Sequence, residues 1–155
     1  AQIAGTVGPG DLVVVGVLRG AFVFMADLVR AIPRDLRCDF LGVRSYGDAT
    51  VSSGVVEITS DLSTPIEGQH VLLVEDIVDT GLTLKYLVDL LMGRSPKSLH
   101  VCCLLSKPSR RKVDVQVDFV GFEAPDQFVV GYGLDFRQRF RNLPFIAVLK
   151  HDLLP

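Results

Sequence analysis

Residues 71–83 limit most strongly what this chain can fold into. The stretch begins with an apolar, β-branched run, which is typical of a strand buried on both faces, and the adjacent carboxylates Glu75 and Asp76 end that run. A short turn follows at residues 79–81, and apolar residues then recur at helical spacing from Leu82 to about Met92. The pattern predicts a buried strand, a tight loop and a helix, in that order.

This strand–loop–helix unit carries groups that bind a sugar phosphate. The first backbone N–H groups of a helix are unpaired and lie at the positive end of its dipole, so they favour an anion. Thr80 and Thr83 add hydroxyl donors, and Gly81 allows a close approach of the backbone. Glu75 and Asp76 can accept hydrogen bonds from a ribose diol or balance the charge of a metal-bound anion. On spacing alone, a capped connection with a solvated acidic pair is an equal alternative.

Composition restricts the class of protein. A length of 155 residues fits one domain, and 48% hydrophobic with 22% charged residues fits a soluble globular protein. The net charge of −2 gives no indication of a nucleic-acid partner. Three cysteines without metal-ligand spacing predict reduced, buried thiols in a cytoplasmic protein. The longest apolar stretch, residues 12–32, is interrupted by charged residues, so we expect no membrane span.

The rest of the chain alternates strands with helices, which favours an α/β fold with a mostly parallel sheet and ligands at the carboxyl ends of its strands. One further helix is expected from Phe22 to near Pro33. A polar stretch, residues 44–53, predicts a hairpin loop, either an ordinary exposed one or a lid. Further strands are expected at residues 12–17, 39–43, 55–59, 99–105, 117–122, 128–132 and 145–149.

Four residues near strand ends could carry chemistry, and each has an ordinary alternative. Lys107 is either a solvated charge or a donor to the carbonyl oxygen of a base. Phe128 is either a core residue or a ring that stacks on a planar heterocycle. Asp135 and Arg141 form a surface ion pair of little worth, or bind a metal and phosphate oxygens.

Residues 71–83 resemble the phosphoribosyl pyrophosphate (PRPP) binding motif of type I phosphoribosyltransferases, and nearly the whole chain resembles the hypoxanthine-guanine branch of that family. The departures are Arg19, where many members have lysine, and Leu82, where some have lysine. Neither change removes a backbone contact to phosphate. The matching segments are Leu18-Arg19-Gly20, Ser45-Tyr46, residues 74–83, Lys107-Pro108, residues 118–123, residues 128–132, Leu134-Asp135 and Phe140-Arg141.

The resemblance implies a fold: a mostly parallel sheet flanked by helices, a small hood from about residues 126–155, and a mobile catalytic hairpin loop. Residues 1–155 would form a single phosphoribosyltransferase domain, and a start at Ala1 suggests that part of the N-terminal segment is lacking. The family also implies a homodimer or homotetramer and Mg²⁺ as cofactor.

The implied reaction moves the 5-phosphoribosyl group from PRPP to N9 of hypoxanthine or guanine, giving IMP or GMP and pyrophosphate. The implied catalytic residues are Asp79, Lys107, Ser45 and Tyr46. The implied PRPP-binding residues are Arg19, Gly20, Glu75, Asp76, Asp79, Thr80, Gly81, Leu82, Thr83 and Arg141. The implied purine-binding residues are Ile77, Lys107, Phe128, Val129 and Asp135, and the implied metal ligands are Glu75, Asp76 and Asp135.

Two other functions stay open. One is a transferase that prefers xanthine or a pyrimidine, because main-chain carbonyls near Val129 can read the 2-position of the base. The other is a PRPP-sensing regulator on the same fold that binds nucleic acid. A regulator predicts a basic face and a degraded base pocket, whereas this chain is acidic and retains Lys107, Phe128 and Asp135.

Overall fold

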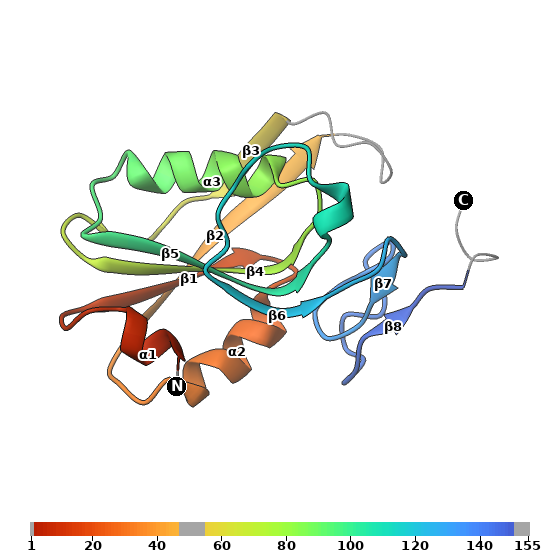
Figure 1. Cartoon of the computed structure of the whole chain (residues 1–155), viewed down its shortest axis with the longest axis horizontal. Helices are drawn as coiled ribbons and strands as arrows, with labels where there is room; N and C mark the ends of the chain where they lie inside the picture. Colours follow the sequence, from red (N-terminus) through yellow and green to blue (C-terminus); the bar gives the residue numbers. More distant parts are fainter. Residues whose placement is uncertain (1, 47–54, 151–155) are drawn as a thin grey trace.

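A six-stranded sheet lies at the centre of the computed structural model, which describes residues 2–46 and 55–150 (Figure 1). Its strand order is β3-β2-β1-β4-β5-β6, and all neighbours are parallel except the antiparallel pair β2–β3. The strands are β1 (Leu12–Leu18), β2 (Arg37–Tyr46), β3 (Val55–Ser60), β4 (His70–Val78), β5 (Ser98–Ser106) and β6 (Phe119–Glu123). The mostly parallel α/β fold predicted from the sequence is therefore confirmed.

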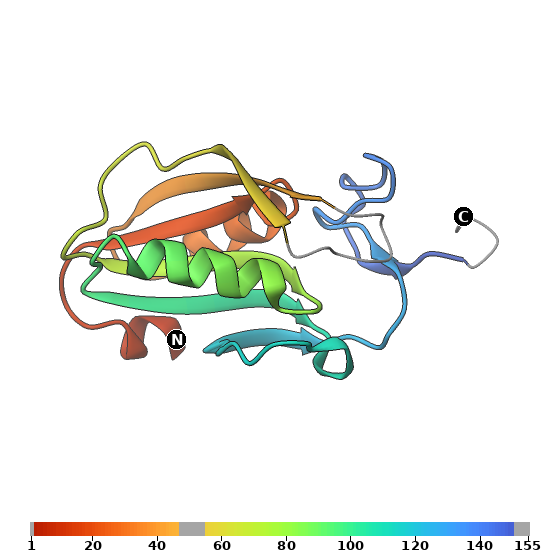
Figure 2. The same cartoon turned by 90° about the horizontal axis from the view of Figure 1, so that it is seen from above.

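The valine-rich strands β1 and β4 are buried on both faces because helices cover both faces of the sheet. On one face, α3 (Leu82–Met92) packs Leu84, Leu87 and Leu91 against β1 and β4. On the other face lie α2 (Phe22–Ala31) and the short α1 (Gln2–Thr6), and Figure 2 shows the layers from above. A fully buried leucine contributes roughly 1.5–3 kcal/mol, so these contacts are a main source of stability.

A two-stranded antiparallel sheet, β7 (Val129–Val130) and β8 (Ala147–Val148), lies beyond the carboxyl ends of the central strands (Figures 1 and 2). Val129 and Leu134 of this region pack on Leu104 and Leu105 of β5. These contacts place the second sheet directly over the edge where a parallel sheet holds its ligands.

Several boundaries differ from the predicted ones. β4 continues through Glu75 and Asp76 to Val78, because its backbone pairs with β5 as far as Ser106. β2 reaches Tyr46, inside the predicted loop, because it stays paired with β3. β5 connects to β6 through residues 107–118, which include the short 3-10 turn η1 (Pro108–Arg110) but no crossover α-helix. β7 and β8 are shorter than predicted. The side chains of Ser45 and Tyr46, and residues 47–54, lie outside the described part of the chain.

All three cysteines are free. Cys102 and Cys103 are buried in β5, and burial raises the pKa of their thiols to about 11 and about 12. The prediction of buried thiols is wrong for Cys38, which is exposed on β2. Among the described residues, no helix is both long and apolar enough to cross a membrane.

Asp39 ties β2 to the loop that follows β3. Its buried carboxylate accepts hydrogen bonds from the backbone N–H groups of Phe40, Ser63 and Thr64, at 2.8, 3.0 and 3.2 Å. Burial by itself would raise the pKa of Asp39, but these hydrogen bonds outweigh it and the pKa is lowered below 3.8. The stability that the carboxylate contributes is therefore present above pH 3.8 and is lost as the pH falls through the lowered pKa.

We expect Asp39→Asn to lower the free energy of unfolding by about 1.5–3 kcal/mol at neutral pH, the usual cost of losing hydrogen bonds to a charge. The difference from wild type should shrink as the pH falls below 3.8, where the carboxylate of the unfolded chain becomes protonated, and should be smallest below the lowered pKa of the native carboxylate. Denaturant unfolding at several pH values measures this. The control, Asp61→Asn, removes an exposed partner of Arg94 and should have a small effect. An equal, pH-independent loss in both variants would contradict the assignment.

Candidate active site

A cavity of about 340 Å³ opens between the carboxyl ends of β4 and β5 and the second sheet. Seven residues singled out from the sequence line it, together with four that were not. The first group is Asp76, Ile77, Asp79, Lys107, Phe128, Val129 and Asp135, and the second is Arg110, Asp126, Gln127 and Leu134. The topology therefore brings together residues from four separate segments of the chain.

Lys107 is buried, with only 7% of its surface exposed, so the interpretation as a solvated charge is wrong. Its backbone N–H donates to the Val78 carbonyl at 2.9 Å, which fixes the end of β5 against the end of β4. Its Nζ donates to the Gln127 carbonyl at 2.7 Å. An ammonium group has three protons, so Lys107 can also donate to a ligand in the cavity that it lines.

Phe128, just before β7, forms part of the cavity wall. Its ring is held edge-to-face against Phe136, with 5.5 Å between centroids and 81° between planes. This arrangement fixes the orientation of the ring, and a flat aromatic face at a cavity wall can stack on a heterocycle.

Glu75 and Asp76 are not a solvated pair. Glu75 is 6% exposed, and burial followed by the charge of Asp76 raises the pKa of Glu75 well above its usual value. Burial likewise raises the pKa of Asp76 to about 6, while Arg141 opposes this shift and Asp135 adds to it. Asp76 thus shares one electrostatic environment with Asp135 and Arg141, which come from the far end of the sequence.

The ion pair between Asp135 and Arg141 is mostly buried, with 24% and 20% of the side chains exposed and 2.8 Å between Oδ1 and Nη2. Arg141 also donates to the Gly133 carbonyl at 2.8 Å, and the second oxygen of Asp135 accepts from the backbone of Gln138 at 2.7 Å. Arg19 donates to the Gln138 amide oxygen at 3.1 Å, which connects the loop after β1 to this segment.

The loop from Asp79 to Gly81 leads into α3. Gly81 has a φ of +84°, in the left-handed region that favours glycine, and a Cβ there would lie 3.1 Å from Val115. Gly81 is the N-cap residue of α3 and makes no side-chain hydrogen bond. Asp79 pairs with Arg110 and does not cap the helix, whereas the Thr80 hydroxyl accepts a long hydrogen bond, 3.4 Å, from the Leu82 N–H. The start of α3 therefore leaves backbone N–H groups that can hold an anion.

Comparison with known proteins agrees with this geometry. Residues 1–137 match the model of the phosphoribosyl transferase domain family. A hypoxanthine-guanine phosphoribosyltransferase of Bacillus subtilis is 58% identical over 88% of this chain and 76% of its own length. A hypoxanthine phosphoribosyltransferase of Haemophilus influenzae is 55% identical, with the same coverage.

Solved structures give the same result. That of a Staphylococcus aureus hypoxanthine phosphoribosyltransferase has a TM-score of 0.94 and 45% identity, covering 99% of this chain and 84% of its own. That of a Trypanosoma cruzi hypoxanthine phosphoribosyltransferase, concerned with the role of its C-terminal region in oligomeric state and activity, has a TM-score of 0.90 and 42% identity, covering 97% and 83%. The chain belongs to the hypoxanthine-guanine phosphoribosyltransferase family.

The predicted metal ligands of this phosphoribosyltransferase, Glu75, Asp76 and Asp135, stay a prediction. Among residues 2–46 and 55–150, no three His, Cys, Asp or Glu side chains form a group that could hold a metal ion. Neighbouring residues of a strand alternate between its faces, and of these two only Asp76 lines the cavity, so Asp76 is the better placed for an ion. Asp76 and Asp135 do influence each other, and Mg²⁺ is commonly bound by one or two carboxylates plus substrate phosphates. These two residues fit such a site.

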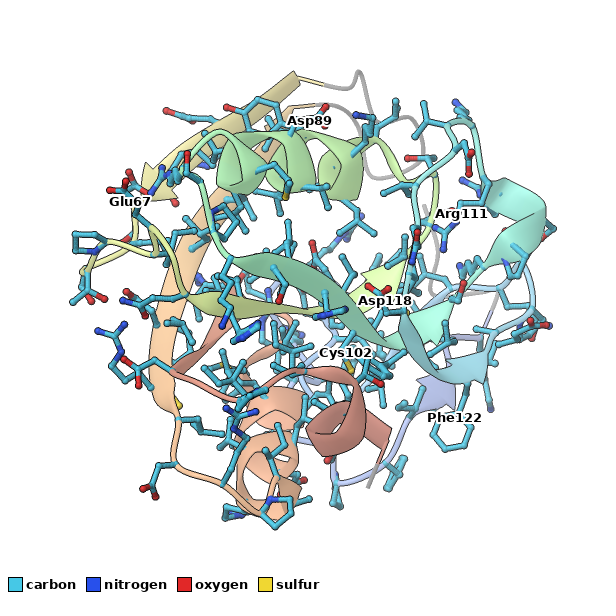
Figure 3. All side chains as sticks on the ribbon, turned by 60° about the vertical axis from the view of Figure 1, so that its left-hand side comes forward. Glu67, Asp89, Cys102, Arg111, Asp118 and Phe122 are labelled. Carbon is cyan, nitrogen blue, oxygen red and sulfur yellow. The ribbon has the colours of Figure 1, made fainter. Side chains whose placement is uncertain are left out.

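Arg110 and Arg111 were not singled out from the sequence as site residues of the phosphoribosyltransferase. Arg110 Nε donates to Asp79 Oδ1 at 3.0 Å, and Arg111 Nη1 donates to the Asp79 carbonyl at 2.9 Å. Figure 3 shows Arg111 beside η1, at the same end of the sheet as the cavity. The available signal was the basic run directly after Lys107, at residues 110–112.

Gly20, in the predicted pyrophosphate loop of this phosphoribosyltransferase, touches Asp76. A Cβ on Gly20 would lie 1.5 Å from Asp76 Oδ2, so any side chain must displace that carboxylate. Overpacking of this kind typically costs about 1–3 kcal/mol. We expect Gly20→Ala to raise KM for PRPP about tenfold, which corresponds to 1.4 kcal/mol.

Steady-state kinetics with PRPP as the varied substrate measures the effect of Gly20→Ala. Gly68→Ala is the control, because that glycine has open space around its Cβ position and lies away from the cavity. Its φ of +68° makes alanine strained there, whereas Gly20 has no positive φ, so this control also shows whether backbone strain alone changes KM. An unchanged KM in Gly20→Ala would mean that Asp76 has no part in binding PRPP.

Proposed function

We propose that this protein transfers the 5-phosphoribosyl group of PRPP to N9 of hypoxanthine or guanine, releasing pyrophosphate and forming IMP or GMP. Family membership supports the reaction class. The observation that carries the choice of base is the buried Lys107, whose ammonium lines the same cavity as Asp79 and Phe128.

On the purine side, Lys107 donates to the 6-oxo group and Asp79 takes the proton of N7 as N9 attacks. Phe128 stacks on the ring, and Ile77 and Val129 line the pocket around it. Adenine is rejected because its 6-amino group would place one donor against the Lys107 donor.

On the PRPP side, the backbone of Thr80, Gly81, Leu82 and Thr83 at the start of α3 holds the 5′-phosphate. Asp76, which lines the cavity, orients the ribose hydroxyls, and a part for Glu75 in this contact stays a prediction. Arg19, Gly20 and Arg141 bind the pyrophosphate, and the connection of Arg19 and Arg141 through Gln138 supports a shared role.

We propose Mg²⁺ as the cofactor, held by Asp76 and Asp135 together with oxygens of PRPP. When bound it would stabilise the negative charge of the leaving pyrophosphate. The raised pKa of Asp76 supports this, because a nearby cation offsets the cost of burying an ionised carboxylate. Ser45 and Tyr46 stay predictions: their loop would close over the site and exclude water from the cationic sugar.

The larger organisation is also proposed. Residues 1–155 form one domain, and the segment from about residue 126 forms the hood, as the position of β7 and β8 over the cavity supports. The enzyme is a cytoplasmic homodimer or homotetramer. Free cysteines support the compartment, and exposed apolar side chains such as Met92 and Phe122 support self-association.

The deciding experiment incubates the protein with PRPP, Mg²⁺ and one free base at a time, and measures nucleotide formation. Hypoxanthine and guanine should give IMP and GMP, and omission of Mg²⁺ should abolish turnover. Xanthine, uracil and adenine serve as alternatives. Faster turnover of xanthine or uracil would establish the alternative transferase, and no turnover with any base would contradict an enzymatic function.

A further inference from the structure

Residues 107–112 form hydrogen bonds with the end of β4 and the loop that follows it. Three of them are to backbone carbonyls: Lys107 N–H to Val78, Arg111 Nη1 to Asp79 and Lys112 N–H to Thr80, each at 2.9 Å. A fourth, from Arg110 Nε to Asp79 Oδ1 at 3.0 Å, reaches a side chain. The backbone of the loop is thus secured without Arg110, and Arg110 acts only on the carboxylate.

Arg110 also reaches the opposite wall of the cavity. Its Nη1 lies 3.4 Å from Asp126 Oδ1, so one guanidinium spans from Asp79 to Asp126. Gln127, the neighbour of Asp126, supplies the carbonyl that holds Lys107 Nζ at 2.7 Å. Residues 126 and 127 therefore hold both groups: Asp79 through Arg110, and Lys107 directly.

We propose that Arg110 is a positioning residue for the transfer reaction, which fixes the Asp79 carboxylate at a set spacing from the Lys107 ammonium. This inference rests on the proposed function, in which these two groups contact N7 and the 6-oxo group of one purine. N7 and the 6-oxo oxygen lie on the same edge of the purine ring. The general base and the hydrogen-bond donor that contact them must therefore be held at a fixed spacing. The ion pair uses Asp79 Oδ1 and leaves the second carboxylate oxygen to accept the N7 proton.

The exposure of these side chains argues against a purely structural role. Arg110, Asp79 and Asp126 are 37%, 40% and 57% exposed, and ion pairs of this exposure contribute little to stability. A guanidinium has a planar fork that fixes the orientation of a carboxylate, which an ammonium does less well. The arrangement therefore favours a role of Arg110 in orienting Asp79 over a role in stabilising the fold.

The test compares Arg110→Gln and Arg110→Lys with wild type, with kcat and KM measured separately for hypoxanthine and for PRPP. We expect Arg110→Gln to lower kcat about tenfold, a loss in keeping with a small misplacement of a catalytic group. Affinity for PRPP, measured by calorimetry, should change by less than about twofold, because Arg110 touches only Asp79 on the PRPP side. Arg110→Lys should recover part of kcat, since it restores the charge but not the fork.

A double variant separates positioning from general damage. If Arg110 acts through Asp79, Arg110→Gln should add no further loss of kcat to Asp79→Asn. The matched control is Arg94→Gln, which removes an arginine from a comparable pair with Asp61, 2.8 Å away and outside the cavity lining. That control should keep the wild-type kcat.

Three outcomes would overturn the inference: an unchanged kcat in Arg110→Gln, an increased kcat, or losses that multiply in the double variant. An increase would mean that Arg110 competes with the purine for Asp79. Wild-type turnover of hypoxanthine is the reference for all of them. If wild type fails to form IMP, the proposed function fails; if wild type is active and Arg110→Gln equals it, only the positioning role fails.

Discussion

Asp79→Asn should lower kcat for hypoxanthine by roughly 10²-fold or more, the usual loss when a general base is removed. Affinity for PRPP should stay nearly unchanged, because we propose that the start of α3 binds the phosphate through backbone N–H groups. Asparagine keeps the size of the side chain and can still accept a hydrogen bond from Arg110, so the loop should keep its shape. Stopped assays of IMP formation give kcat, and calorimetry gives the affinity for PRPP.

The control for this variant is Asp89→Asn on α3, an exposed aspartate paired with Lys85 and visible in Figure 3. It makes the same chemical change away from the cavity lining and should keep wild-type kinetics. Comparable turnover of hypoxanthine by Asp79→Asn and wild type would remove Asp79 from the role of base.

Lys107→Ala should weaken the binding of hypoxanthine and guanine far more than the binding of PRPP. Losing a charged hydrogen bond typically costs about 1.5–3 kcal/mol, which is one to two decades in kcat/KM. Discrimination against adenine should relax in the same variant, because the donor that opposes a 6-amino group is gone. The measurement is the ratio of kcat/KM for guanine to that for adenine, in wild type and variant.

Because Lys107 is buried, a second variant is needed at this position. Lys107 is 7% exposed, so alanine also leaves empty space and an unpaired Gln127 carbonyl. Lys107→Met fills the space without the charge and should show the same change in the base ratio. An unaltered ratio in both variants would mean that Lys107 does not read the 6-position.

The sequence predicted the elements whose patterns are dominated by burial. β1, β4 and β5 are apolar runs, and α3 repeats Leu84, Leu87 and Leu91 at helical spacing, so hydrophobic periodicity located them closely. The ends of β2 and β4 were missed because pairing with a neighbouring strand carries a polar segment into the sheet. Which strands pair, and how far, depends on tertiary contacts that no local pattern contains.

The same distinction between local patterns and tertiary contacts applies to the site. Lys107 and Asp79 could be placed near one another because the parallel strands β4 and β5 end at one edge. Phe128 comes from the second, antiparallel sheet, so this rule does not place it. The partner of Asp79 could not be placed, because Arg110 reaches it through the shape of a single turn. The metal ligands stay a prediction, in which Asp76 and Asp135 line the cavity and Glu75 does not. Segment position was readable from the sequence, and so was the Asp135–Arg141 ion pair as one of two alternatives, whereas the pairing of Asp79 with Arg110 was not.

The positions of the three cysteines allow thiol labelling to measure local opening of the central sheet. Cys38 is exposed and should react with a thiol reagent in the native state, whereas Cys102 and Cys103 are buried in β5 and their raised pKa values disfavour the reactive thiolate. Modification of the second and third thiols therefore requires β5 to leave the sheet. Mass spectrometry of a timed labelling reaction would count molecules with one or three labels, and so measure how often the centre of the sheet opens under native conditions.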